Sequence, residues 1–266
     1  IVILTIISFY YYMTFARQYS LVLLLLLVYC YFLSYSFTFF KKDIQRKILL
    51  LLSVSSFIII LIYFRYLSFV VENIELLLNI KLRVSTSPFF FFGISYIIFQ
   101  LIGYFIDIYY NRIKVEKNFF NFALFLLFFP KINSGPIERG IKMLPQFHND
   151  NIYNIDFKSI KDGLKMFIWG YFSKVVISDR LSIAVNRVFS DSSGFDHIQI
   201  LIAIIFFTLQ VYTDFMGYTF MALGTSKMLG FNLTNNFHLP FFSQSIGDFW
   251  KRWHISLSFW LRDYLF

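Results

Sequence analysis

Long runs without a charged residue alternate with short polar segments along the chain. Three such runs cover residues 18–40, 48–64 and 84–106, and a fourth covers residues 197–213. As helices with a rise of about 1.5 Å per residue, runs of this length can cross a bilayer core of about 30 Å or nearly so. The pattern therefore predicts an all-α integral membrane protein, built as a polytopic helix bundle.

Polar residues at membrane depth distinguish the second half of the chain. The apolar segment 118–130 is too short to span comfortably, which indicates a short or re-entrant helix. The longest polar stretch follows it, and an acid, Asp214, later interrupts a membrane-helix pattern. We expect one membrane-embedded domain over residues 1–266, with mainly lipid-facing scaffold helices in 1–110 and a polar loop plus site-forming helices in 111–266.

Composition agrees with a membrane protein and excludes other classes. Hydrophobic residues make up 58% of the 266 residues and charged residues 15%, whereas soluble domains average about 45–50% and about 25%. These values exclude disordered, collagen-like and disulfide-rich chains. Cys30 is the lone cysteine, and the four histidines lack the spacing of a zinc site, so neither a disulfide framework nor a metal is predicted.

The net charge of +9 comes from 24 basic and 15 acidic residues. In a soluble protein such a charge would suggest nucleic-acid binding, but here the basic residues cluster between apolar runs. Cytoplasmic loops of membrane proteins are enriched in lysine and arginine. The densest cluster, residues 41–47, is therefore predicted to lie on the cytoplasmic side, and no nucleic-acid partner is expected.

Asp214 is the first candidate for a functional residue, because a carboxylate inside a membrane helix is costly. Helical spacing places Gln210 and Tyr218 one turn away on the same face. Gly217 and Gly224 would let another backbone approach closely. Two roles stay open for Asp214. We favour a structural carboxylate that joins two helices through a hydrogen bond or a buried cation; the other role is direct catalysis.

The second candidate is His254, which lies in a segment rich in tryptophan. Read as one helix, the segment has an aromatic face, with polar residues opposite it and along its edges. The polar residues are Asp248, Lys251, Arg252, His254, Ser256, Ser258, Arg262 and Asp263. Histidine exchanges a proton near neutral pH and is the commonest general base. An amphipathic helix anchored at the membrane surface explains the pattern equally well.

Four segments resemble motifs of the membrane-bound O-acyltransferase family, in the family's order. The resemblance is greatest to the branch of bacterial polysaccharide O-acetyltransferases such as the alginate acetylases. The segments are 93–100 (GISYIIFQ) with Tyr104, Asp107 and Tyr109, 135–139 (GPIER) with 144–147 (LPQF), 212–218 (YTDFMGY), and 248–258 (DFWKRWHISLS) with 260–264 (WLRDY). The last is long and specific.

The resemblance implies an enzyme that transfers an acyl group, expected to be acetyl, from a thioester to a hydroxyl of an extracytoplasmic polysaccharide. The reaction would take place in a funnel between the helices, with acetyl-CoA or another acyl thioester as donor substrate and no bound cofactor. His254 matches the histidine of the family's W-H-x-S motif and is the expected catalytic residue. The other residues expected to line or support the site are Gln100, Arg139, Asp214, Tyr218, Asp248, Arg252, Ser258, Arg262 and Asp263.

The resemblance also departs from the family in two places. Phe220 stands where many relatives carry a second acid. The family's most invariant histidine normally lies beyond the position of Phe266. We therefore expect this chain to be the N-terminal portion of such an enzyme, truncated at the C-terminus, and inactive by itself.

The expected location is a bacterial cytoplasmic membrane, crossed several times. The expected partners are the lipid bilayer, the glycan acceptor, and an extracellular or periplasmic acetyl-transfer partner or an acyl-carrier protein. Transfer of D-alanine to teichoic acid is the alternative within the family. A polytopic transporter or flippase is the alternative outside it, since an acid within the membrane suits both, although the two halves show no repeat symmetry.

Overall fold

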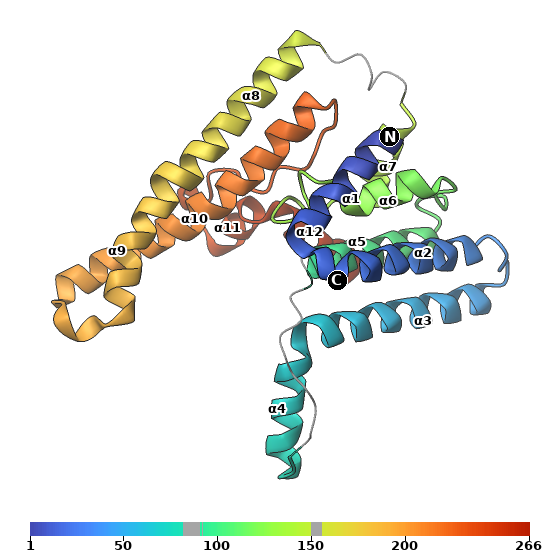
Figure 1. Ribbon diagram of the computed structural model, residues 1–266, viewed down its shortest axis with the longest axis horizontal. Coiled ribbons are helices and arrows are strands. Elements are labelled where there is room, and N and C mark those ends of the chain that lie inside the picture. Colours follow the sequence, from blue (N-terminus) through green and yellow to red (C-terminus); the bar gives the residue numbers. More distant parts are fainter. Residues whose placement is uncertain (82–90, 92, 150–155) are drawn as a thin grey trace. The chain divides into compact units, whose positions relative to one another are not determined.

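The computed structural model describes residues 1–81, 91, 93–149 and 156–266, and every regular element in these residues is a helix (Figure 1). The predicted all-α fold is therefore confirmed. The described chain divides into two compact units. Unit 1 comprises Ile1–Asn133 and Ile137–His148, and unit 2 comprises Ser134–Pro136 and Asn149–Phe266. A single domain that encloses a funnel stays a prediction.

Unit 1 contains the helices that the first uncharged runs predict. Its α-helices are α1 (Val2–Ala16), α2 (Ser20–Ser36), α3 (Asp43–Leu61), α4 (Leu67–Leu78), α5 (Ile94–Tyr109), α6 (Phe119–Leu127) and α7 (Gly140–Phe147). A 3₁₀ turn joins α1 to α2, and a π-helical turn joins α3 to α4. The third uncharged run overlaps α5, but its residues 84–90 and 92 lie outside the described residues.

Three helical segments in the described residues are long and apolar enough to cross a membrane. They are Val2–Ser36 and Asp43–Leu78 in unit 1 and His197–Met228 in unit 2. Large apolar side chains along these segments are more than half exposed, for example those of Leu25 and Phe69. Such surfaces suit contact with lipid rather than water. The expectation of several membrane passes is therefore confirmed.

The core of unit 1 forms where α5 packs against α3 and α6 packs against α1. Aromatic side chains such as Tyr104, Phe122 and Phe125 are fully buried there. The helix α6 has only nine residues, and it begins where the side chain of Asn118 accepts a hydrogen bond of 2.9 Å from the N–H of Phe120. The short helix predicted in residues 118–130 is therefore present, and protein surrounds it.

Unit 2 is a hairpin of long helices followed by two short ones. Its α-helices are α8 (Phe157–Phe172), α9 (Asp179–Ser190), α10 (His197–Met228), α11 (Ile246–Arg252) and α12 (Ile255–Tyr264), and a π-helical turn (Ser173–Ser178) links α8 to α9. A capping box starts α10, because Asp196 and Gln199 bond each other's backbone N–H groups. The helix then continues through Asp214, as predicted.

Glycines allow α8 and α10 to pack with their backbones in contact (Figure 1). A Cβ atom at Gly170 would lie 2.5 Å from the carbonyl oxygen of Gly217, and one at Gly163 would lie 2.6 Å from that of Gly224. The close backbone approach predicted at Gly217 and Gly224 is thus confirmed. This contact brings the turn after α8 next to the middle of α10, where Asp214 lies.

Candidate active site

The predicted site residues fall in both units of the chain. Unit 1 holds Gln100 and Arg139. Unit 2 holds Asp214, Tyr218, Asp248, Arg252, His254, Ser258, Arg262 and Asp263. The expected catalytic histidine therefore lies in the same unit as Asp214 and the other residues of the tryptophan-rich segment.

The tryptophan-rich segment is not one helix, which corrects the sequence-based interpretation. The helix α11 ends at Arg252, and α12 begins at Ile255. Between them His254 adopts a left-handed backbone conformation, with φ 43° and ψ 53°. Such a conformation is strained for a residue other than glycine, and it persists only where the surroundings enforce it. The single apolar face derived from helical periodicity is therefore interrupted at the histidine.

A buried asparagine holds this break in place. The carbonyl oxygen of Asn236 accepts a hydrogen bond from the N–H of Ile255 at 3.0 Å, and its side-chain oxygen accepts one from the N–H of Ser256 at 3.1 Å. The N–H of His238 in turn donates to the carbonyl oxygen of Arg252. The first N–H groups of α12 thus find partners outside the helix, as a helix start requires. Sequence reasoning gave Asn236 no role.

The imidazole ring of His254 lies against aromatic side chains. It meets Phe215 of α10 edge to face, with ring centroids 4.7 Å apart. Phe215 also contacts Phe237, which packs against Trp253 at a centroid distance of 5.1 Å. Burial in these apolar surroundings lowers the pKa of His254 from 6.5 to about 4. The ring is therefore neutral at neutral pH, which is the form that can accept a proton.

Two buried polar atoms near this break have no partner among the residues that the structure describes. They are the Nδ1 atom of His254 and the side-chain nitrogen of Asn236. Buried polar groups in folded proteins are almost always hydrogen-bonded, so such exceptions call for an explanation. One explanation is a site whose polar groups are completed by a substrate, by water or by further protein.

The charged residues of α11 and α12 form local contacts. Arg252 donates to Asp248 at 2.9 Å, and this hydrogen bond lowers the pKa of the Asp248 carboxyl group. The Ser258 hydroxyl donates to the carbonyl oxygen of Trp250 at 3.1 Å, which ties α12 back to α11. These contacts stabilise the corner around His254.

The end of α12 carries a second charged pair. Arg262 donates to the carboxylate of its neighbour Asp263 at 2.8 Å, and this bond raises the pKa of Arg262. The guanidinium group also lies over the ring of Phe259, 4.7 Å from its centroid. This geometry suits a supporting role for both residues, and their predicted part in the site stays a prediction.

Asp214 has the cationic partner that its structural role requires. The Nζ atom of Lys174, in the turn after α8, lies 2.6 Å from Asp214 and 2.7 Å from Asp179. It also lies 5.5 Å from the centroid of the Tyr218 ring. The contact joins α10 to the α8–α9 connection and favours a structural role for Asp214. Sequence reasoning expected a buried cation as one possible partner of Asp214 but did not identify Lys174.

In unit 1, Gln100 belongs to a buried polar cluster around Lys131, which sequence reasoning also missed. The Nζ atom of Lys131 donates to the side-chain oxygen of Gln100, and to the carbonyl oxygen of Phe125 at 2.7 Å. Lys131 is 1% exposed, and burial lowers its pKa from 10.5 to about 7, with a smaller opposing effect of Glu138. Arg139 lies at the start of α7. Neither arrangement reveals a catalytic role for Gln100 or Arg139.

No cluster of three or more histidine, cysteine or acidic side chains suited to a metal ion occurs in the described part of the chain. The metal-free site stays a prediction.

Sequence comparison relates the chain to known proteins, although no family model matches it. A probable alginate O-acetylase of Pseudomonas putida is 37% identical over 231 residues, which are 85% of this chain and 46% of the relative. A peptidoglycan O-acetyltransferase of Helicobacter pylori is 29% identical, over 90% of this chain and 50% of the relative. The chain belongs to the membrane-bound O-acyltransferase family.

The membrane-bound O-acyltransferase relatives also include a teichoic acid D-alanyltransferase of Bacillus subtilis. It is 32% identical over 66% of this chain and 45% of the relative. The chain thus spans about half the length of the curated relatives that it matches. Within unit 2, two of the family-like motifs meet directly, because Phe215 of the Y-x-D-F segment contacts His254 of the W-H-x-S segment.

Proposed function

We propose that the protein is a membrane O-acyltransferase that transfers an acetyl group from a thioester to a hydroxyl of an extracytoplasmic polysaccharide. Relatives named for their action on alginate and peptidoglycan support a polysaccharide acceptor. The observation that carries the proposal is the half-buried, strained His254, whose buried Nδ1 atom has no partner among the described residues. Acetyl-CoA or another acyl thioester serves as donor substrate, and we propose no bound cofactor.

In the proposed reaction, the neutral imidazole of His254 takes the proton of the acceptor hydroxyl as its oxygen attacks the thioester carbonyl carbon. A C–O bond forms, and the tetrahedral intermediate then collapses with loss of the C–S bond. The leaving thiolate receives the proton from the imidazolium ring. The products are a glycan ester and a free thiol, and the histidine is neutral again.

The low pKa of His254 fits a base that works next to developing negative charge. In the free protein, burial disfavours the imidazolium form and keeps the ring ready to accept a proton. When the tetrahedral oxyanion forms, its negative charge stabilises the imidazolium form and raises the basicity of the ring. The favourable interaction thus arises in the transition state rather than in the ground state.

The similarity to a D-alanyltransferase also favours an alternative pair of acceptor and donor substrates. The teichoic acid D-alanyltransferase of B. subtilis exceeds 30% identity to this chain. Under this alternative, a D-alanyl thioester on a carrier protein replaces the acetyl donor, and teichoic acid replaces the polysaccharide. The same histidine chemistry would apply, so the two alternatives differ in substrates.

The experiment tests His254→Ala in the complete protein, in membrane vesicles supplied with labelled acetyl-CoA and either alginate or peptidoglycan. We expect ester formation to fall by about 10²–10⁴-fold, as for loss of a general base. His197→Ala is the matched control, because His197 is exposed at the start of α10, and it should retain activity. Tryptophan fluorescence, to which the four tryptophans of unit 2 contribute, verifies that each variant folds.

Nearly unchanged activity in His254→Ala would show that the histidine is a structural or interfacial residue. A parallel reaction with a D-alanyl carrier-protein thioester and teichoic acid separates the two substrate alternatives. Turnover of the D-alanyl thioester without turnover of acetyl-CoA would replace the acetyl proposal with the second one.

A further inference from the structure

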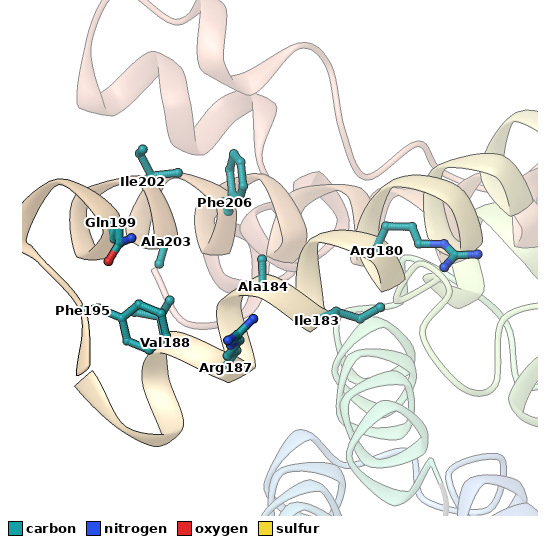
Figure 2. Close-up of a pocket in the computed structure, with 10 residues that line it drawn as sticks. All are labelled: Arg180, Ile183, Ala184, Arg187, Val188, Phe195, Gln199, Ile202, Ala203 and Phe206. Carbon is teal, nitrogen blue, oxygen red and sulfur yellow. The ribbon is translucent and has the colours of Figure 1, made fainter. Parts of the chain in front are cut away.

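A groove of about 430 Å³ lies between α9 and α10, outside the residues around His254 (Figure 2). Both walls belong to unit 2. The apolar part of the lining includes Ile183 and Val188 of α9, Phe195 of the connecting turn, and Ile202 and Phe206 of α10. The volume falls within the range of about 300–1,000 Å³ typical of sites for small molecules.

Two arginines of α9, Arg180 and Arg187, also line this groove (Figure 2). They are seven residues apart, so they lie on one face of the helix, about 10.5 Å apart along its axis. Both are exposed, and no carboxylate in the described residues pairs with either guanidinium group. The neighbouring acids are engaged elsewhere, Asp179 with Lys174 and Asp191 with Ser193.

The groove lies beside the beginning of a candidate membrane span. Its α10 wall comes from the first three turns of His197–Met228. The polar turn before this span contains Asp191, and its last residue, Asp196, caps α10. The start of the span is therefore at the boundary of the bilayer, where lipid phosphates and the first part of the acyl chains lie.

We propose that this groove binds an anionic phospholipid, with its phosphate at Arg187, on the turn of α9 nearest the start of the span, and an acyl chain along the apolar walls. Arg180 adds positive charge farther along the same helix. The planar guanidinium group binds phosphate through paired hydrogen bonds, and two unneutralised arginines provide charge complementarity. An uncharged amphiphile would leave both arginines without a counter-charge. A soluble anion would leave the apolar walls unfilled.

The experiment measures which lipids stay bound to the complete protein, by native mass spectrometry after purification from mixed detergent–lipid micelles. The micelles contain equal amounts of phosphatidylglycerol and phosphatidylcholine with identical acyl chains. We expect preferential retention of phosphatidylglycerol by the unmodified protein. In the double variant Arg180→Gln/Arg187→Gln, the preference should fall by roughly tenfold or more, because the phosphate contact of Arg187 and the positive charge of Arg180 are both lost.

Two further variants separate a seated lipid from general charge attraction. Arg17→Gln/Arg65→Gln removes two exposed arginines elsewhere, and it should keep the preference. Ala184→Phe fills the groove without changing charge, and it should reduce retention of phosphatidylglycerol severalfold. The proposal fails if Arg180→Gln/Arg187→Gln retains phosphatidylglycerol normally. It also fails if Ala184→Phe has no effect, because the lipid would then not occupy the groove.

Discussion

Each unit of the protein contains a basic side chain whose pKa is lowered by burial, fully buried in the case of Lys131 and half-buried in that of His254, and the two differ in their hydrogen-bond partners. In unit 1, burial lowers the pKa of Lys131 to about 7, and in unit 2 it lowers that of His254 to about 4. Lys131 donates to Gln100 and to the carbonyl oxygen of Phe125. The Nδ1 atom of His254 has no partner among the described residues.

This difference separates a structural polar cluster from a candidate site. A satisfied buried network fixes the packing around it, and a buried polar atom without a partner costs stability. The cluster around Lys131 is already complete within its own unit. The corner around His254 is held by Asn236 and by aromatic contacts and leaves its imidazole open to a further partner. We therefore expect changes at Lys131 to act on folding and changes at His254 to act on turnover.

The largest expected effect on stability is that of Lys131→Ala. The variant leaves a cavity and two acceptors without a donor, which together cost about 3–5 kcal/mol. Hydrogen exchange of the α5 and α6 amides measures the loss within unit 1. Lys117→Ala is the control, because Lys117 is exposed, and its exchange should be nearly unchanged. Normal protection of α5 and α6 in Lys131→Ala would contradict the structural role of Lys131.

The two bases also predict separate pH windows for stability. Folded His254 has a pKa of about 4, below its ordinary value of 6.5, so between these values the unfolded chain binds a proton that the folded chain does not. Unit 2 should therefore lose up to about 3 kcal/mol as the pH falls from 6.5 to 4. Lys131 has a pKa of about 7 against 10.5, so unit 1 should gain stability as the pH rises through that interval.

Tryptophan fluorescence follows unit 2, which contains all four tryptophans, and hydrogen exchange follows unit 1. His254→Gln should remove the contribution of His254 on the acid side and leave the alkaline change in unit 1 intact. An acid-side loss of the same size in His254→Gln would assign it to other groups.

An intermediate effect is expected from Gly170→Ala, which adds a Cβ atom where α8 meets the backbone of α10. The atom would lie 2.5 Å from the carbonyl oxygen of Gly217, so the helices must separate, at a cost of about 1–3 kcal/mol. Gly194→Ala is the control, since its Cβ atom would meet nothing within 4 Å. The loss should appear in unit 2 alone, and equal stabilities of the two variants would contradict the close packing.

Periodicity and residue type predicted much of the fold before any contact was known. The uncharged runs predicted α2 and α3, and the small residues Gly217 and Gly224 predicted the close packing of α10. These features depend on residue type and spacing within one segment, which can be read directly from the sequence. The matched W-H-x-S motif likewise pointed to His254.

Long-range partners could not be predicted in this way. Lys174 and Asp214 are 40 positions apart, and Lys131 and Gln100 are 31 apart, so only the packing of helices pairs them. The break at His254 was missed for a related reason. Its left-handed backbone depends on hydrogen bonding to Asn236, which lies in a separate loop. This contact overrides the helical pattern of the local sequence.

The smallest expected effect is that of Asp214→Asn, which tests a third base, Lys174. Burial opposes its charged form, but hydrogen bonds with Asp179 and Asp214 raise the pKa of Lys174. Asparagine keeps an acceptor oxygen, and Asp179 keeps its charge at 2.7 Å from the ammonium group. Because the ion pair is also partly exposed, the variant should cost less than about 1 kcal/mol and retain much of the turnover.

Asp179→Asn/Asp214→Asn removes both counter-charges of Lys174, and it should cost more than the sum of the two single variants. Thermal unfolding in detergent, followed by tryptophan fluorescence, measures all three. A structural role for Asp214 requires that activity and stability fall together along this series. Complete loss of transfer in Asp214→Asn at an unchanged melting temperature would instead give Asp214 a part in the chemistry. The catalytic residues of unit 2 would then include Asp214 on α10 as well as His254.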